Sequence, residues 1–384
     1  MTAALVDRRR FARAFASAIG ACFLPAGAPK LAATRAPAEP RTGYPPGTLR
    51  LDSNENPYGP SPAAIEAMGR SHTIAARYPD ALEDELVRSL AKIHGVATEN
   101  LLMGCGSGEL LRMADMAFLR PDRKVVAAEP TFEAVLWYAG VTRAEPIKVP
   151  LTSDFRHDLP RMAEACDAST GLVYVCNPNN PTGTIVARDE LRTFIERVPR
   201  SVVVLVDEAY HHFVEDGRYA SALEWVAATP NLIVVRTFSK IYGLAGMRLG
   251  YAVGSKVSME AMARHRLWND TNVAAIEAAA ASLQDAGHVP RNRRAINETR
   301  RRLCDEIAKD GRVVIPSEAN FVMIDVGSDV EPVIAAMKSR DILVGRKFPS
   351  LPTWLRVSIG TPDEMRRFLA AFRAVVPARE TRAA

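Results

Sequence analysis

Short apolar runs alternate along the body of the chain with longer stretches of helical periodicity. The runs are rich in β-branched residues and about five residues long, which is typical of strands buried on both faces of a sheet. Strands are predicted over residues 124–128, 172–176, 202–206 and 232–235, and helices over 109–118 and 189–197. This alternation indicates an α/β fold with a mostly parallel central sheet between helices.

The order of elements changes from about residue 277. A long arginine-rich helix over about 291–309 is followed by an apolar run from Phe321, a further helix and a strand-like segment over 355–360. Strands and helices that follow one another in this mixed way are typical of an α+β arrangement. A smaller C-terminal α+β domain is therefore predicted over 277–384.

The length of 384 residues and the hydrophobic content of 48% allow a large core and favour two domains. A large cofactor-binding domain is predicted over 76–276. Residues 45–75 are expected to form an N-terminal arm and part of the small domain. The stretch 51–62 holds three prolines and a glycine, so it is expected to cross the surface.

Charge and apolar content exclude several classes of protein. No run of about 18 uncharged apolar residues occurs, so stable membrane insertion is not expected. The net charge of +5 is modest and the arginines are dispersed, which does not suggest a nucleic-acid partner. The five cysteines show no paired short spacing, so neither a zinc site nor a disulfide framework is indicated.

Residues 1–40 have the pattern of an export signal: a basic start, a weakly apolar alanine-rich middle and a region of small residues. Arg8, Arg9 and Phe11 resemble the core of a twin-arginine signal, which serves proteins that fold before export. A periplasmic location is therefore predicted, with cleavage near 28–38. The alternative is an arginine-rich extension on a cytoplasmic enzyme.

Each predicted strand of the sheet leads into a distinctive polar or glycine-containing segment. These segments are Glu129-Pro-Thr-Phe132, Asn177-Pro-Asn-Asn180-Pro-Thr-Gly183, Asp207-Glu-Ala-Tyr210 and Ser239-Lys240. The carboxyl ends of parallel strands meet at one edge of a sheet, where ligands of such folds bind. The sequence therefore predicts a binding site at this edge.

Lys240 is the most distinctive residue of these segments. Only nine of the 49 basic residues are lysine. A guanidinium group stays protonated, whereas an ε-amine can lose its proton and form a Schiff base. Lys240 could by itself be a solvated loop residue, but its neighbours at the other strand ends favour amine chemistry.

If Lys240 carries an aldehyde cofactor as an imine, the cofactor that fits is pyridoxal 5′-phosphate. The ring nitrogen of this cofactor stays protonated only beside a buried carboxylate, which Asp207 could supply. Tyr210 and Asn180 could donate to the ring hydroxyl oxygen, and Phe132 could stack on the ring face. By itself, each of these residues also has a purely structural interpretation.

The cofactor phosphate needs backbone amides at a helix start and a cation. The turn Gly106-Ser107-Gly108 precedes a predicted helix, and Ser239 and Arg248 could add a hydroxyl group and a positive charge. A glycine-rich turn alone is a weak signal. His211 and His212 lie nearby but lack partners at metal-ligand spacing, so no metal is expected.

The chain resembles the fold-type I aminotransferases of class I/II, and within them the histidinol-phosphate aminotransferase group. The resemblance covers most of the chain. It is carried by Asn54-Glu-Asn-Pro-Tyr58-Gly-Pro, Arg77-Tyr78-Pro-Asp, Gly104 to Glu109, Asn177 to Gly183, Asp207 to Tyr210, Ser239-Lys240 through Arg248, Asn320-Phe321, and Leu355-Arg356-Val-Ser-Ile-Gly360. The sequence departs from this pattern at Gly108, where an acidic residue is usual, and over 344–349.

The resemblance implies roles for these residues. Lys240, Asp207 and Tyr210 would be catalytic, with Asn180 and Tyr210 on the ring hydroxyl oxygen. Arg356 would bind the carboxylate of the substrate, with Asn180 and Arg346 as further substrate contacts. The resemblance implies that the cofactor phosphate is held by the loop Gly106, Ser107 and Gly108 together with Ser239 and Arg248. Tyr58 would reach the cofactor of a neighbouring subunit, which implies a homodimer.

The function implied by the resemblance is ping-pong transfer of an amino group to a 2-oxo acid. The donor would be an L-amino acid or a histidinol-phosphate-like amine. One alternative is a decarboxylase or lyase of the same fold, which would share most of the cofactor-binding residues. An alternative of another class is a non-catalytic aminotransferase-like binding module, although such modules usually carry a fused DNA-binding domain.

Overall fold

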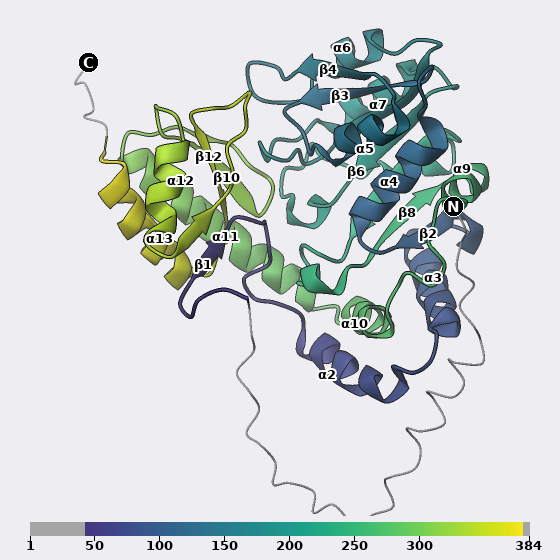
Figure 1. Cartoon of the computed structure of the whole chain (residues 1–384), viewed down its shortest axis with the longest axis horizontal. Helices are drawn as coiled ribbons and strands as arrows, with labels where there is room; N and C mark the ends of the chain where they lie inside the picture. Colours follow the sequence, from purple (N-terminus) through teal and green to yellow (C-terminus); the bar gives the residue numbers. More distant parts are fainter. Residues whose placement is uncertain (1–42, 379–384) are drawn as a thin grey trace, which may run out of the picture. The chain divides into compact units, whose positions relative to one another are not determined.

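The computed structural model describes residues 43–378, and the chain from Gly47 onward forms one compact unit. The predicted export signal in residues 1–40 lies outside the described residues. Within the described part, no helix is both long and apolar enough to cross a membrane. Figure 1 shows the elements in chain order, from the purple strand β1 to the yellow helix α13.

A seven-stranded sheet forms the centre of the structure. Its strands are β2 (Leu101–Gly104), β3 (Lys124–Glu129), β4 (Pro146–Pro150), β5 (Thr170–Cys176), β6 (Val203–Asp207), β7 (Leu232–Thr237) and β8 (Gly250–Gly254). The order across the sheet is β2-β8-β7-β6-β5-β3-β4, and only β8 runs antiparallel to its neighbours. The prediction of a mostly parallel sheet is confirmed, and all four predicted strands belong to it.

The apolar runs are continuous because β5, β6 and β7 are buried on both faces. Successive side chains of a strand point to opposite faces. Val173 and Val204 therefore pack in one apolar cluster, whereas Tyr174 and Leu205 pack in another on the opposite face. A polar side chain in the middle of these strands could not reach water on either face, so most polar groups of the site follow the ends of the strands.

Helices cover both faces of this sheet. One face is covered by α4 (Ser107–Phe118), α5 (Ala134–Thr142) and α9 (Lys256–Ala263), which supply apolar side chains to the cluster around Tyr174. The other face is covered by α3 (Asp80–His94), α6 (Leu159–Glu164), α7 (Arg188–Arg197) and α10 (Val273–Gln284). Further short elements are α2 (Pro62–Ser71), α8 (Leu223–Val226), η1 (His72–Ile74), η2 (Thr98–Asn100), η3 (His211–Phe213) and η4 (Ala245–Met247).

The remaining strands form two small sheets. Strands β9 (Val314–Ile315), β10 (Phe321–Asp325) and β12 (Trp354–Ser358) pair antiparallel, and β1 (Leu49–Leu51) pairs parallel with β11 (Ile342–Val344). They are accompanied by α11 (His288–Lys309), α12 (Glu331–Lys338) and α13 (Pro362–Val375). The predicted arginine-rich helix is confirmed as α11, which begins a few residues earlier than expected.

The stretch 51–62 does not simply cross the surface. Asn54 and Asn56 are buried, so the prediction of a surface arm is wrong for this part. The Asn54 side chain accepts a hydrogen bond from the hydroxyl group of Ser358, and the Asn320 amide donates to the Asn54 carbonyl oxygen. These partners lie far away in the sequence, so local composition could not reveal the burial.

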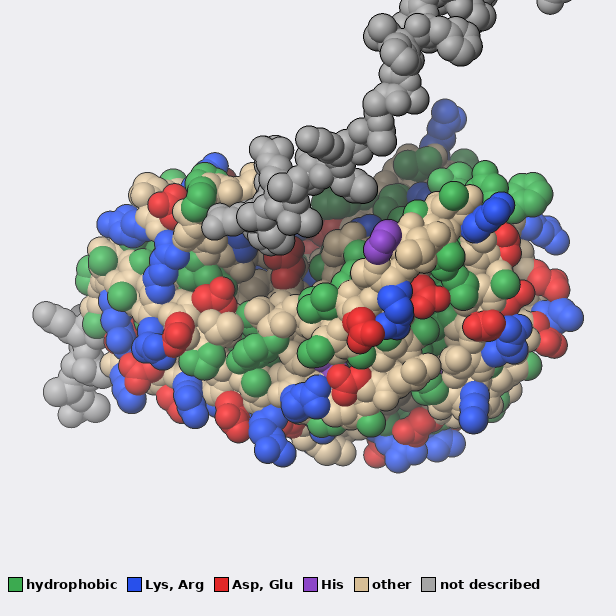
Figure 2. Space-filling model, turned by 90° about the horizontal axis from the view of Figure 1, so that it is seen from below, with side chains coloured by type: hydrophobic (Ala, Val, Ile, Leu, Met, Phe, Trp, Pro, Cys, Tyr) green, Lys and Arg blue, Asp and Glu red, His purple; other side chains and the backbone are tan. Residues whose placement is uncertain are grey.

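The surface carries mixed charge. On the face shown in Figure 2, lysine and arginine side chains are interspersed with aspartate and glutamate. Many of them form ion pairs, such as Arg156 with Glu190 and Arg188 with Glu224. A mixed surface of this kind contrasts with the basic stripe that binds the phosphate backbone of a nucleic acid.

Asp115 is a buried carboxyl group inside α4. It is 0% exposed, and neither carboxylate oxygen has a hydrogen-bond partner among residues 43–378. Burial raises the pKa of Asp115 to about 8. The carboxyl group is therefore neutral in the folded protein below about pH 8, although it ionises near pH 4 in an unfolded chain.

This difference predicts a pH-dependent stability. Between about pH 4 and pH 8 the folded state binds one proton more than the unfolded state, so the free energy of unfolding falls as the pH rises, by up to about 1.4 kcal/mol per pH unit. Asp115→Asn should remove this contribution. The free energy of unfolding of the variant should therefore rise relative to that of the wild type between pH 5 and pH 8. The measurement is the urea midpoint at each pH.

The matched control for this experiment is Asp122→Asn, because Asp122 is an exposed aspartate in the turn after α4. This control should follow the wild type at every pH. Parallel pH profiles for Asp115→Asn and the wild type would contradict the assignment of a neutral Asp115.

Candidate active site

A cleft of about 410 Å³ opens at the carboxyl ends of β5, β6 and β7. It is lined by Asp52, Ser53, Asn54, Glu55, Ser107, Gly108, Phe132, Cys176, Asn180, Asp207, Ala209, Tyr210, Thr237, Ser239, Lys240, Ala245, Arg248 and Arg356. Four separate strand ends and the turn before α4 therefore meet in one place, as the topology of the sheet requires.

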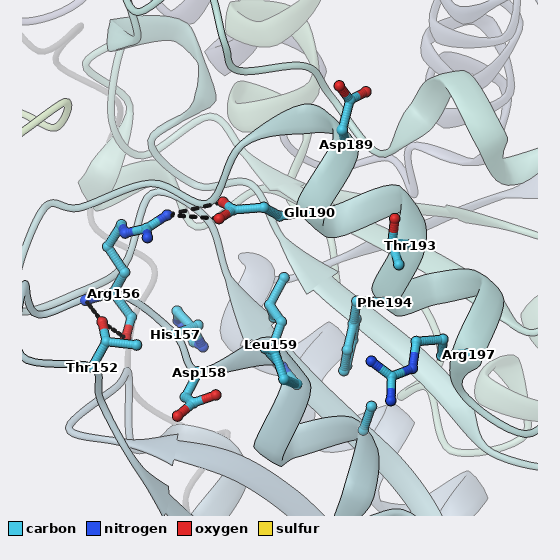
Figure 3. Close-up of a pocket in the computed structure, with 12 residues that line it drawn as sticks. Thr152, Arg156, His157, Asp158, Leu159, Asp189, Glu190, Thr193, Phe194 and Arg197 are labelled. Atoms are coloured by element: carbon cyan, nitrogen blue, oxygen red, sulfur yellow. Dashed lines mark hydrogen bonds and ion pairs between the residues drawn. The ribbon is translucent and has the colours of Figure 1, made fainter.

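A second cavity, of about 490 Å³, lies between α6 and α7 (Figure 3). Some of its polar side chains already have partners. Arg156 pairs with Glu190 at 2.9 Å, and the Asp158 carboxylate caps α6 by accepting from the Arg161 amide at 3.2 Å. No lysine that could form an imine is among the residues that line this cavity, so the cleft at the strand ends is the candidate active site.

Lys240 lies in this cleft directly after β7. Its Nζ donates to the Ser53 carbonyl oxygen at 3.1 Å. Withdrawal from bulk water and the positive charge of Arg356 lower the pKa of Lys240 to about 8, with a further lowering by Arg248. Glu55 and Asp207 oppose this shift. The amine is therefore partly neutral near physiological pH, as a nucleophile or a general base must be.

Asp207 ends β6 and is only 2% exposed. Its Oδ2 accepts from the Tyr174 hydroxyl group at 2.9 Å, and its Oδ1 accepts from the Ala209 amide at 3.0 Å. Burial raises the pKa of Asp207 to about 6, and the two hydrogen bonds limit the rise. A cationic partner placed beside it would stabilise its carboxylate form.

Tyr210 contacts two amide groups in the cleft. Its hydroxyl oxygen accepts from Asn54 Nδ2 at 3.0 Å and from Asn180 Nδ2 at 3.5 Å. Burial raises the pKa of Tyr210 well above its usual value. The hydroxyl group therefore keeps its proton, and because both amides donate to the oxygen, that proton is free to be donated to a ligand.

The turn before α4 forms a cradle with Arg248. Gly106 has a φ of +81°, and a Cβ atom at this position would lie 2.1 Å from Nη2 of Arg248. The guanidinium group thus lies directly against the loop backbone, and its Nη1 donates to Ser239 Oγ at 3.3 Å. Ser107 and Gly108 also line the cleft. Backbone amides at a helix start beside a fixed cation suit a phosphate group.

Arg356 faces Lys240 from β12. Its Nη1 donates to Asn180 Oδ1 at 2.8 Å and its Nη2 donates to the Asp52 carbonyl oxygen at 2.6 Å. Its Nε is buried and has no hydrogen-bond partner in the described part of the chain. A buried donor without a partner costs free energy, so an anionic ligand would be stabilised here.

Three residues predicted from the sequence lie at or beyond the edge of the cleft. Phe132 lines it and is 36% exposed. Tyr58 is 41% exposed and does not line the cleft of its own chain. Arg346 does not line it either, and its Nη2 donates to the Glu133 carboxylate instead.

Sequence reasoning missed Asn54 and Tyr174 as parts of the site. Asn54 has a left-handed φ of 54°, which asparagine tolerates better than most residues, and its partner Tyr210 is 156 residues away. Tyr174 lies inside an apolar run and looks like a core residue. Its only signal is that a buried tyrosine needs a hydrogen-bond partner.

The residues present fit pyridoxal 5′-phosphate. A cradle for a phosphate, a buried carboxylate for a ring nitrogen and an amine of lowered pKa converge in one cleft. Fold and cleft together define a pyridoxal-phosphate-dependent transaminase of fold type I. The family model "Aminotransferase class I and II" matches residues 46–372, and the chain belongs to this family.

Comparison with known proteins places the chain in the histidinol-phosphate aminotransferase-like group. It is 40% identical over 331 residues to a histidinol-phosphate aminotransferase of Moorella thermoacetica, covering 85% of each chain. It is 38% identical to an aromatic amino acid aminotransferase of Rhodococcus jostii, covering 85% of this chain and 89% of the relative.

A similar solved structure is that of histidinol-phosphate aminotransferase from Sinorhizobium meliloti in complex with pyridoxal-5′-phosphate. The TM-score is 0.81 at 26% identity, covering 86% of this chain and 90% of the other. These comparisons give less support to a decarboxylase or to a non-catalytic module. Among residues 43–378, no group of three or more possible metal ligands occurs.

Proposed function

We propose that the protein moves an amino group from an L-amino acid or a histidinol-phosphate-like amine to a 2-oxo acid. The carrying observation is that Lys240, partly neutral near physiological pH, lies in one cleft with the buried carboxylate of Asp207 and the guanidinium group of Arg356. The named relatives act on histidinol phosphate or on aromatic amino acids, and both kinds of substrate present an amine near an anionic group.

The residues of the cleft have separate tasks in this reaction. Arg356 would bind the anionic group of the substrate and so place the α-carbon within reach of Lys240. Neutral Lys240 would take the proton from the α-carbon of the substrate and deliver it to C4′ of the cofactor. The bound cofactor would supply an electron-withdrawing ring that makes the proton on the α-carbon more acidic. The Asp207 carboxylate would hold the ring nitrogen in its protonated form, and Tyr210 would donate to the ring oxygen.

A screen of amino donors tests this proposal. The protein loaded with pyridoxal phosphate is mixed with single L-amino acids or histidinol phosphate, and the absorbance change of the half-reaction is recorded. We expect at least one donor to convert the cofactor to its amine form, and added 2-oxoglutarate to reverse the change. Release of carbon dioxide without amino transfer would contradict the proposal.

We also propose a homodimer with shared active sites. The supporting observation is that Tyr58 is exposed and lies outside the cleft of its own chain. Light scattering should give twice the mass of one chain. If the protein is a dimer, then inactive Lys240→Ala and Tyr58→Ala chains mixed after unfolding should regain partial activity, because one hybrid site receives both native residues.

The export of the protein remains a separate proposal, which the resemblance of Arg8, Arg9 and Phe11 to a twin-arginine signal supports. We expect the mature protein to begin within or just after residues 28–38 and to be recovered from the periplasm. N-terminal sequencing of the protein from cell fractions makes the measurement, and an intact N-terminus in the cytoplasm would contradict it.

A further inference from the structure

The side chain of Asn54 lies between the Tyr210 hydroxyl group and the end of strand β12. Asn54 Nδ2 is 3.0 Å from the hydroxyl oxygen of Tyr210, and Asn54 Oδ1 is 3.1 Å from Oγ of Ser358, the last residue of β12. All three residues are at most 3% exposed. Because so little of them is open to water, their polar groups depend on one another for hydrogen bonds.

The backbone of Asn54 sets the direction of the Ser358 hydroxyl group. The Asn54 amide N–H donates to Ser358 Oγ at 2.8 Å, so this oxygen is an acceptor on that side. The proton of Ser358 is then available to Asn54 Oδ1. A carboxamide has one acceptor oxygen and one donor nitrogen, so an Oδ1 bound to Ser358 leaves Nδ2 facing Tyr210.

The same argument extends to the phenol group of Tyr210. Nδ2 of Asn54 can only donate, so the phenol oxygen accepts and its proton remains available to a ligand. A hydroxyl group that accepts a hydrogen bond also becomes a better donor. Asn180 donates to the same oxygen at the longer distance of 3.5 Å, and its role proposed above is to bind the ring oxygen of the cofactor. Asn54 is therefore the closer donor to Tyr210.

The backbone around Asn54 keeps its side chain in this place. Its φ of 54° lies in the left-handed region, which asparagine tolerates better than most residues. Its carbonyl oxygen accepts from Asn320 Nδ2 at 3.0 Å. The position of the Asn54 carboxamide is thus fixed by its backbone, and the orientation of that group is fixed by Ser358.

We propose that Ser358 and Asn54 are positioning residues that set the direction of this hydrogen-bond chain and so aim the phenol proton of Tyr210 at the ring oxygen of the cofactor. This inference rests on the role proposed for Tyr210 and adds the residues that control it. With the carboxamide reversed, Oδ1 would face Tyr210 and accept the phenol proton in place of the cofactor.

Loss of the Ser358 hydroxyl group should change the acid–base behaviour of the bound cofactor. In Ser358→Ala, the Asn54 carboxamide loses the partner that orients it, so donation from Tyr210 to the ring oxygen weakens. That donation stabilises negative charge on the ring oxygen and makes the imine nitrogen at Lys240 less basic. We therefore expect the midpoint of the pH-dependent absorbance change of the cofactor to rise by up to about 1 pH unit.

Three companion variants make the titration specific. Ser358→Thr keeps a hydroxyl group and should follow the wild type. Asn54→Gly removes the carboxamide, and because glycine adopts a φ of 54° without strain, it should raise the midpoint without a backbone change. Ser282→Ala is the matched control, since the hydroxyl group of this buried serine donates within α10, to the Ala278 carbonyl oxygen at 2.8 Å, and it should leave the midpoint unchanged.

Combination with Tyr210→Phe separates a positioning role from a purely structural one. Tyr210→Phe alone should raise the midpoint at least as far as Ser358→Ala does. Because Ser358 acts through the phenol proton, Ser358→Ala should cause no further shift in the Tyr210→Phe background. A general loosening of the cleft would instead shift the midpoint in both backgrounds.

The affinity for pyridoxal phosphate gives a second readout. The protein without cofactor is titrated with pyridoxal phosphate, and the dissociation constant is obtained from the absorbance. We expect Ser358→Ala to raise this constant about five-fold, which corresponds to the weakening of one hydrogen bond between uncharged groups. In the Tyr210→Phe background the same substitution should leave the constant unchanged.

Two outcomes would overturn the inference. One is a midpoint shift below about 0.2 pH unit in both Ser358→Ala and Asn54→Gly, and the other is an undiminished effect of Ser358→Ala in the Tyr210→Phe background. Failure of the proposed function is distinguishable. A wild type that transfers amino groups from no donor would refute that function, while the two titrations need no amino donor and still decide the roles of Ser358 and Asn54.

Discussion

Replacing Lys240 with alanine should lower the rate of amino transfer at least about 10³-fold, because the variant loses both the imine-forming amine and the general base of the cleft. Among the described residues, Lys240 is the one lysine that lines the cleft, and its Nζ lies 3.1 Å from the Ser53 carbonyl oxygen. The measurement is single-turnover kinetics with the best donor of the screen. Retention of more than about 1% of the rate would refute this role.

Two further lysine variants make the result specific. Lys240→Arg keeps the positive charge but cannot be deprotonated near neutral pH, so it should be as inactive as the alanine variant. Lys148→Ala removes an exposed lysine paired with Glu129 and should retain full activity. The pKa of Lys240 is lowered, so loss of this amine should not lower the urea midpoint of the protein without cofactor.

The second large effect is expected for Asp207→Asn. Asparagine has nearly the same shape, and its carbonyl oxygen can still accept from the Ala209 amide, while its NH2 group replaces the oxygen that accepts from the Tyr174 hydroxyl group. The asparagine side chain carries no charge. The ring nitrogen would then lose the anion that favours its protonated form. We expect kcat to fall about 10²- to 10³-fold, which is the usual range for removing one preorganised electrostatic partner.

The pH dependence separates this electrostatic role from a structural one. The ring nitrogen of the bound cofactor, followed by absorbance, should lose its proton at a lower pH in Asp207→Asn than in the wild type. The urea midpoint should change little. Asp122→Asn, an exposed substitution, should change neither property. An unchanged kcat in Asp207→Asn would show that the carboxylate has no part in the reaction.

The strands and the edge of the sheet were predictable from the sequence because their signal is local. The runs that form β5, β6 and β7 are apolar throughout, since both faces of each strand are buried. In a parallel sheet, the residues that follow such strands must share one edge. Lys240, Asp207 and Tyr210 could therefore be grouped before their distances were known, and the structure brings them into one cleft.

The long-range partners were not predictable in this way. Asn54 lies in a proline-rich stretch that looked like a surface arm, and it is buried because Tyr210, Ser358 and Asn320 satisfy its polar groups. Arg346 was expected to contact the substrate. Only the folded chain shows its pairing with Glu133, which is 213 residues away.

The sequence by itself determined the mostly parallel sheet, the cofactor and the membership of the aminotransferases, because these depend on periodicity and on short motifs at the ends of strands. The tertiary structure decided which protonation states and ion pairs the site contains. Burial lowers the pKa of Lys240 and raises that of Asp207, and the approach of distant segments pairs Glu133 with Arg346. Desolvation and Coulomb energy depend on distances in space, and spacing along the chain does not specify those distances.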